Sequence, residues 1–220
     1  MLLNDILWNF IVKKDSSYFE KYLDFIKTTV QQDEERVKQE EAKISKVVTE
    51  KEEVTDENNF ISVDDYLADL FGDHKQLEQI MYRSFVISIF AFIEAKIVDL
   101  CKHIKEERVQ LFSYTDLSGA RGIGQAVKYL EKVLMLDKFP INNKLYDEFN
   151  IAHKIRNYLV HEEGKIKSED TIKIKINKTH PNILHIDQSG EIIITFEYAK
   201  SLIALNKNIC NEISQNLKSH

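Results

Sequence analysis

The stretch MYRSFVISIFAFIEAKIVDLC, residues 81–101, decides the fold of this 220-residue chain. On a helical wheel its apolar side chains lie on nearly every side. A helix of this kind is stable in water only when other helices surround it. We therefore expect a central helix from about Lys75 to Glu107, with the hydrophobic core built around it.

The composition favours a globular, mainly helical protein. Hydrophobic residues make up 43% of the chain and charged residues 30%, with only two prolines and six glycines. The length suits one domain with an extension, or two small ones. A formal net charge of -6 argues against a surface that binds nucleic acid all over, but it permits a local basic site.

A long charged helix is predicted upstream, from about Ser17 to Val54, because this stretch has few turn residues and many Glu, Lys and Gln. Three apolar residues recur in it at seven-residue spacing: Val30, Val37 and Ile44. The alternating positions Asp33 and Glu40 are charged, where a coiled coil has leucine. A solvated arm that packs one narrow stripe on the body is favoured over a true coiled coil.

A short helix is expected between this arm and the central helix. Ser62 can cap it, and Gly72-Asp73 should end it after Phe71. We therefore predict two regions, an N-terminal helical extension at 1–73 and a helical bundle at 74–220.

Downstream, the pattern predicts two helices, a small sheet and a last helix. A glycine-bearing loop at 115–124 precedes the helix AVKYLEKVLML (126–136), and a second helix runs from about Asn142 to His161, with Gly164 as its stop. The stretch TIKIKINK (171–178) alternates strictly, and two further short strands flank Gln188-Ser189-Gly190, so a hairpin sheet is expected at about 171–196. A final helix is expected at about 197–217.

One arginine in the second of these helices stands out. On a wheel at about 100° per residue, the apolar positions form one stripe: Leu145, Phe149, Ala152, Ile155 and Leu159. Arg156 lies on the edge of this stripe, so it should be partly desolvated and need a partner. Glu94 is the obvious partner, because it shares a face with apolar residues of the central helix. Such a pair could be purely structural.

Two further residues with functional side chains, Asn157 and His161, follow Arg156 in the same helix. His161 lies five residues after Arg156 at the helix end, and Asn157 lies one turn before His161 on the same side. A cation, a titratable base and an amide are thereby grouped. A single histidine at a helix end is more often explained by a favourable interaction with the helix dipole.

The segment KIRNYLVH, residues 154–161, resembles the R-x-x-x-x-H motif, in its R-N-x-x-x-H form, of the higher eukaryotes and prokaryotes nucleotide-binding (HEPN) superfamily. Glu94, in FIEAKIVDLC, sits where such proteins often carry an acidic residue on an earlier core helix. The resemblance covers about 80–163 plus a helical tail. It implies a HEPN-type helical bundle and metal-independent RNA cleavage at a cleft between two protomers, each supplying Arg156 and His161.

The implied chemistry assigns a role to each of the four residues. His161 would take the proton from a ribose 2′-hydroxyl or give one to the leaving 5′-oxygen, and Arg156 would stabilise charge on the phosphate. Asn157 would position the phosphate or the histidine, and Glu94 would hold the guanidinium. The product would carry a 2′,3′-cyclic phosphate.

Five basic residues are candidates for RNA contact: Arg121, Lys154, Lys165, Lys173 and Lys175. On the predicted strand Lys173 and Lys175 share one face, although lysines on an edge strand more often prevent aggregation.

We predict no metal and no cofactor, because His180 and His185 lack zinc-ligand spacing and His103 and His153 are isolated. Cys101 and Cys210 are expected to be reduced, packed thiols.

The role implied by the resemblance is that of a homodimeric endoribonuclease used as a toxin or in phage defence, with RNA as substrate and an antitoxin or defence-system protein as a partner. The alternatives are a non-catalytic interaction module and a module that binds nucleotides or RNA without cleavage.

The N-terminus lacks signal-peptide features, and the longest apolar run, 85–93, is roughly half of a membrane span. We therefore expect a cytoplasmic protein without a membrane partner.

Overall fold

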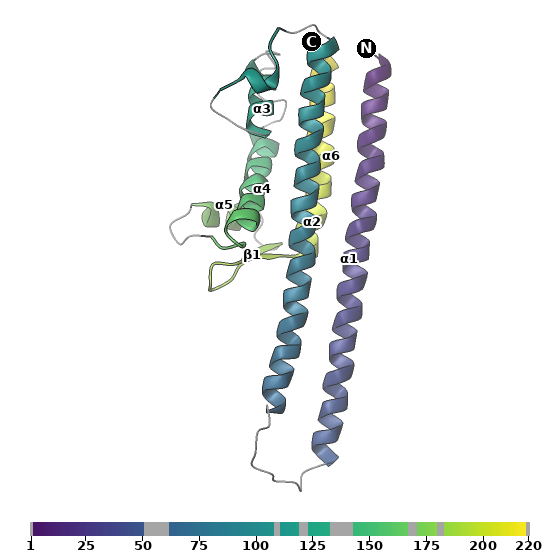
Figure 1. The fold of residues 1–220 in the computed structure, drawn as a ribbon, viewed down its shortest axis with the longest axis vertical. Coiled ribbons are helices and arrows are strands. Elements are labelled where there is room, and N and C mark those ends of the chain that lie inside the picture. Colours follow the sequence, from purple (N-terminus) through teal and green to yellow (C-terminus); the bar gives the residue numbers. More distant parts are fainter. Residues whose placement is uncertain are drawn as a thin grey trace.

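A computed structural model describes residues 2–50, 62–107, 111–118, 123–132, 143–166, 171–179 and 183–218. In this part the protein is mainly helical, with one two-stranded antiparallel hairpin near the C-terminal end, which confirms the predicted fold class (Figure 1). In chain order the elements are α1 (Leu2–Glu50), α2 (Val63–Glu107), the 3-10 turn η1 (Tyr114–Asp116), α3 (Ile123–Lys132), α4 (Asn143–His161), α5 (Ile172–Thr179), β1 (Leu184–Ile186), β2 (Ile192–Ile194) and α6 (Phe196–Lys218).

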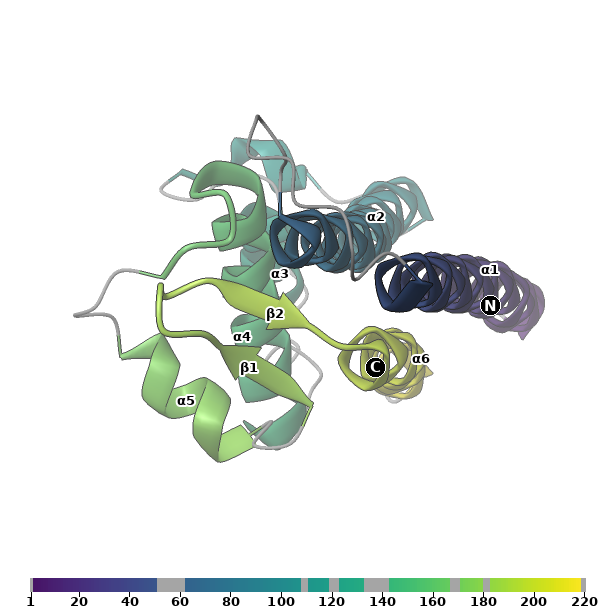
Figure 2. The ribbon, with the colours of Figure 1, turned by 90° about the horizontal axis from the view of Figure 1, so that it is seen from below.

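Three long helices, α1, α2 and α6, run side by side. The end-on view shows them grouped together, with α3, α4, α5 and the hairpin gathered beside them (Figure 2). Helix α1 packs on both α2 and α6, and α2 also contacts α3 and α4. Beyond the hairpin α1 and α2 continue as a projecting pair (Figure 1).

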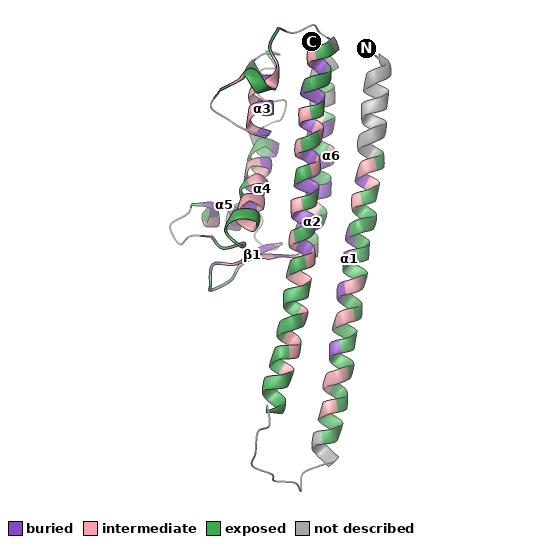
Figure 3. Cartoon of the chain, viewed as in Figure 1, coloured by how far each residue is buried: buried purple, intermediate pink, exposed green. Residues whose placement is uncertain are grey.

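Between residues 14 and 47, helix α1 buries one narrow stripe, and its other residues are exposed or half-buried (Figure 3). The buried residues described in this helix follow heptad spacing: Ser16, Leu23, Ile26, Val30 and Val37. At the heptad position between the last two, Asp33 Oδ2 lies 2.8 Å from His74 Nδ1 on α2. This hydrogen bond from His74 is the main reason that the pKa of Asp33 lies below its ordinary value, so a carboxylate is tolerated in the seam.

Helix α2 is continuous, so the predicted break at Gly72-Asp73 is wrong. The helix does begin with the predicted cap, in which Ser62 Oγ accepts a hydrogen bond from the Asp65 N–H at 3.0 Å. A Cβ at Gly72 would meet nothing within 4 Å. A solvent-facing glycine inside a helix costs only about 1 kcal/mol, which the packing of the rest of a long helix outweighs. The predicted region boundary after residue 73 therefore falls inside α2.

The apolar stretch of α2 builds the core, as predicted. Its large side chains are buried on one arc of the helix: Phe85, Val86, Ile89, Phe90, Ile93 and Ile97. The prediction of burial on every side needs one correction, because a face of small residues is exposed: Ser84, Ser88, Ala91 and Ala95. The helices around α2 therefore cover most of its surface and leave one side open.

The stretch TIKIKINK forms helix α5, so the predicted strand is wrong. Ile172 and Ile176 are fully buried, whereas Ile174 is 71% exposed. Residues four apart share a face in a strand and also in a helix, so these two isoleucines satisfy both periods. Packing of α5 on α4 and β1 selects the helix.

The remaining C-terminal elements agree with their predictions. Strands β1 and β2 pair antiparallel with Leu184 opposite Ile194 and Ile186 opposite Ile192, and Gly190 in the turn has a φ of +87°. Helices α4 and α6 lie within about two residues of their predicted bounds. Helix α3 begins earlier than predicted, at Ile123, and residues 133–136 lie outside the described ranges.

Alanine substitutions in α5 distinguish the helix from a strand. Ile176→Ala should lower the free energy of unfolding by about 2–5 kcal/mol, because it empties a buried site. Ile174→Ala should change it by less than about 0.5 kcal/mol, because that side chain is exposed. Urea denaturation measures both. Comparable losses in the two variants would indicate a strand, in which both residues share a face.

Candidate functional site

Helix α4 packs against α2 and runs in the opposite direction. Near the middle of α4, Phe149 and His153 contact Phe90, with ring centroids 5.5 Å apart in each pair. Gly164, just beyond the end of α4, lies beside Arg83, two turns earlier on α2. The two packed helices therefore carry the predicted site residues, Glu94 on α2 and Arg156, Asn157 and His161 on α4.

Arg156 lies on the edge of the buried face of α4, as predicted. Leu145, Phe149, Ala152 and Ile155 are buried, and Arg156 is half-buried beside them. Its Nη1 donates to Asn157 Oδ1 at 3.1 Å. Its Nε is buried and has no hydrogen-bond partner in the described part of the chain. Because buried polar groups normally have partners, the Nε is an unsatisfied donor of this guanidinium.

The predicted ion pair between Glu94 and Arg156 is not formed between these two described residues. Glu94 Oε1 instead accepts a hydrogen bond from the Ile123 N–H at 3.1 Å. The first N–H groups of a helix lack partners inside it and lie at the positive end of its dipole, so they attract a carboxylate. Glu94 therefore caps α3. Its charge still acts on His153, as does the charge of Arg156.

His153 belongs to this cluster, although the sequence indicated an isolated histidine. Its ring stacks nearly parallel on Phe90, at an interplanar angle of 10°. Its Nε2 lies 3.5 Å from Asn157 Nδ2. Burial lowers the pKa of His153 below its ordinary value of 6.5, Arg156 lowers it further, and Glu94 opposes both. His153 and Asn157 are four residues apart on one helix, and this spacing could have revealed the contact.

His161 is the last residue of α4 and its side chain is exposed. Asn157, one turn earlier, is half-buried and accepts the hydrogen bond from Arg156. The structure thus brings Arg156, Asn157 and His153 into one cluster, with Glu94 nearby. His161 lies at the exposed end of the same helix, where solvent or a ligand can reach it.

The end of α4 is held by the hairpin and α2. After His161 the chain turns with positive φ at Glu163 (53°) and Gly164 (82°), and the Gly164 N–H donates to the Tyr158 carbonyl at 2.9 Å. The Gly164 carbonyl then accepts from the Ile192 N–H at 2.9 Å. This pairing with β2 fixes the position of the helix end, and with it the backbone of His161.

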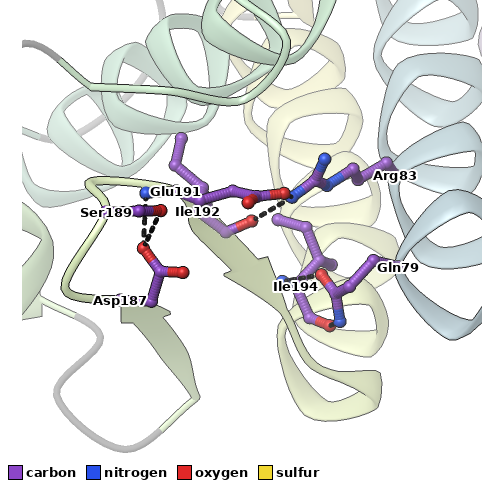
Figure 4. A network of polar contacts seen from close by, with 7 residues as sticks. All are labelled: Gln79, Arg83, Asp187, Ser189, Glu191, Ile192 and Ile194. Atoms are coloured by element: carbon purple, nitrogen blue, oxygen red, sulfur yellow. Dashed lines mark hydrogen bonds and ion pairs between the residues drawn. The ribbon is translucent and has the colours of Figure 1, made fainter. Parts of the chain in front are cut away.

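Arg83 and Gln79 of α2 reach across to the same strand (Figure 4). Arg83 Nη2 donates to the Ile192 carbonyl at 3.0 Å and pairs with the Glu191 carboxylate at 2.5 Å. Gln79 bonds the backbone of Ile194 twice, donating from Nε2 at 3.1 Å and accepting at Oε1 at 2.8 Å. Helix α2 thereby supports both the middle of α4 and, through β2, its end.

The predicted RNA-contacting residues are scattered more widely. Lys154, Lys165 and Lys175 are exposed, and Lys173 is half-buried. Lys173 and Lys175 do not share a face, because residues two apart on a helix differ by about 200°. That correction follows from the helical state of α5. Arg121 lies outside the described residues.

Groups for other kinds of chemistry are few among the described residues. No three or more His, Cys, Asp or Glu residues are grouped so as to hold a metal ion. Cys101 and Cys210 are buried free thiols, as predicted, and burial raises the pKa of each to about 12. No helix in the described ranges is long and apolar enough to cross a membrane.

An open hollow of about 420 Å³ lies between α4 and α6, toward the start of α4 and away from Arg156. Its lining is almost entirely polar: Lys144, Leu145, Glu148, Asn208, Asn211, Glu212 and Gln215. It offers no buried cation or base to a ligand.

No family model matches the chain, and no curated protein or solved structure matches it either. A function for this protein therefore has to be inferred from its own residues and geometry.

The turn after α4 requires glycine at position 164, and substitution tests this requirement. Gly164→Ala should lower the free energy of unfolding by about 1–2 kcal/mol, because alanine is strained at positive φ and its Cβ would lie 3.3 Å from the Arg83 guanidinium. Gly72→Ala is the matched control, since its Cβ meets nothing within 4 Å and alanine favours a helix, so stability should rise by about 0.5–1 kcal/mol. Urea denaturation measures both changes. Equal effects in the two variants would contradict this account of the turn.

Proposed function

We propose that this chain is a metal-independent endoribonuclease of the HEPN type. The carrying observation is Arg156, a half-buried guanidinium that Asn157 holds through Nη1 and whose buried Nε lacks a partner in the described part of the chain. An RNA phosphate would supply acceptors for such a group. The motif spacing puts the exposed His161 at the end of the same helix, where it can act as the base and acid.

The proposed reaction needs no metal ion or cofactor. His161 removes the proton from a ribose 2′-hydroxyl, whose oxygen attacks the adjacent phosphorus atom. The bond from phosphorus to the 5′-oxygen breaks, and that oxygen receives a proton from protonated His161. Arg156 stabilises the charge that builds on the phosphate oxygens. The products are a 2′,3′-cyclic phosphate and a free 5′-hydroxyl.

The active form is proposed to be a homodimer with its two sites at the interface. The exposed small residues of α2, from Ser84 to Ala95, support this proposal, because they make an uncharged face in a chain with 30% charged residues. Ile80, 54% exposed, extends that face by one turn. Small side chains allow another helix to approach closely.

The biological role that fits such an enzyme is that of a toxin or a phage-defence effector acting on cellular RNA. An uncontrolled ribonuclease harms its own cell, so a neutralising partner protein is part of this proposal. The projecting pair formed by α1 and α2, with its exposed charged surface, offers that partner a place to bind.

One observation favours a second candidate, a non-catalytic module that binds a protein, a nucleotide or RNA. Glu94 caps α3 instead of holding Arg156, so this acidic residue has a structural role that requires no catalysis. In that case the projecting α1–α2 pair would be the functional part of the molecule.

Cleavage of total RNA by the purified protein in EDTA tests the enzyme. We expect Arg156→Ala to reduce cleavage by about 10²–10³-fold and His161→Ala by about 10²–10⁴-fold. Mass spectrometry should find 2′,3′-cyclic phosphate ends. Lys144→Ala is the control and should cleave normally, because Lys144 lies at the start of α4, away from Arg156, and its side chain is 88% exposed. A folded wild type that cuts none of several RNAs, or cleavage retained in both site variants, would favour the binding module.

Disruption of the α2 face tests the dimer. Ala91→Arg should produce monomers and abolish cleavage, because a long charged side chain would prevent close approach of a second copy. Ile174→Arg, at another exposed position, should leave the assembly unchanged. Sedimentation velocity at micromolar protein measures the assembly. A wild type that cleaves RNA as a monomer would contradict the composite site.

A further inference from the structure

The side chain of Asn157 joins Arg156 to His153. Arginine has only donors, so the atom of Asn157 that contacts Arg156 Nη1 must be the carbonyl oxygen Oδ1, at 3.1 Å. The other end of the amide, Nδ2, then faces His153 Nε2 at 3.5 Å. The orientation of the amide is therefore set by its contact with the arginine.

This orientation of the Asn157 amide determines the protonation state and the tautomer of His153. Nδ2 of Asn157 carries only hydrogens, so His153 Nε2 must accept, and the single ring proton of the neutral histidine lies on Nδ1. A protonated ring would point an N–H at the N–H₂ group of Asn157. It would also place a second cation near Arg156, whose Nε already lacks a partner.

We propose that neutral His153 acts, through Asn157, as a positioning residue for Arg156, and that protonation of His153 releases the arginine from its orientation for RNA cleavage. The proposal rests on the ribonuclease function proposed above. His153 need not touch RNA, because its contribution is the hydrogen bond that holds the Asn157 amide.

The surroundings of His153 come from two helices. From α2, Phe90 covers one face of the ring and Glu94 acts on its charge; from α4, Phe149 stacks beside it at 6.3 Å and Arg156 repels a second positive charge. Burial and Arg156 together lower the pKa of His153 below 6.5 despite Glu94. The neutral form therefore predominates at pH 7, and the arrangement is lost as the pH falls through the lowered pKa.

A purely structural role for His153 would make a different prediction. If the ring only fills space between Phe90 and Phe149, then His153→Phe should behave as the wild type, because it keeps a flat ring of similar size. His153→Gln has the opposite properties, since it offers an acceptor to Asn157, loses the stacking ring and cannot be protonated.

Nitrogen-15 NMR of the full-length protein tests the geometry without any cleavage assay. We expect the neutral His153 ring to carry its proton on Nδ1 and the Asn157 side-chain amide to shift as His153 titrates. A neutral ring protonated on Nε2, or an Asn157 amide that does not respond to that titration, would overturn the proposal.

The pH dependence of RNA cleavage tests the consequence, with thermal melting to show that each variant is folded. His153→Phe should lower kcat by about 10–100-fold, as misplacement of a catalytic group does. His153→Gln should retain most of the wild-type kcat and lose the contribution of His153 to the acid limb. A His153→Phe enzyme with wild-type kcat and pH profile would overturn the proposal. A wild type with no cleavage would refute the ribonuclease, and the NMR result would still decide whether His153 positions Arg156.

Discussion

The fold depends on burial of the apolar arc of α2. Phe85 meets Phe19 and Tyr22 of α1, Phe90 meets Phe149 of α4, and α2 also packs on α3 and α6. Each buried large apolar side chain contributes about 1.5–3 kcal/mol, so this single helix carries much of the hydrophobic stabilisation. The helices α1, α4 and α6 are placed by the need to cover it.

The candidate site results from the packing of α4 on the apolar arc of α2. Because α4 must pack its stripe on α2, Arg156 at the edge of the stripe is drawn partly out of water. Asn157 and His153, on the side of α4 next to that edge, then form the hydrogen-bonded support for the guanidinium. The same helix α2 anchors β2 through Arg83 and Gln79, and β2 anchors the end of α4. One scaffold helix thereby holds the site at two points.

Helix caps and long periodic stretches could be predicted from the sequence, because they depend on contacts within a few residues. The Ser62 cap, the bounds of α4 and α6, and the edge position of Arg156 are of this kind. Predictions that needed knowledge of the partner were less successful. Ile172 and Ile176 share a face in a strand and also in a helix, so their spacing did not distinguish the two. Glu94 was predicted to pair with Arg156, and the Ile123 N–H that it contacts could not be identified from the sequence.

The sequence by itself determined which segments are apolar, on which faces, and therefore that the protein is a helical bundle with a small hairpin and an arginine at a buried edge. Only the tertiary structure decided that Ile172 and Ile176 pack as a helix, that α3 begins where its N-terminus captures Glu94, and that His153 is stacked on Phe90. The physical reason is the sequence distance over which each interaction acts. Periodicity and capping depend on residues within one or two turns of each other. The partner of the Glu94 carboxylate and the ring that stacks on His153 come from other elements, which meet only in the folded chain.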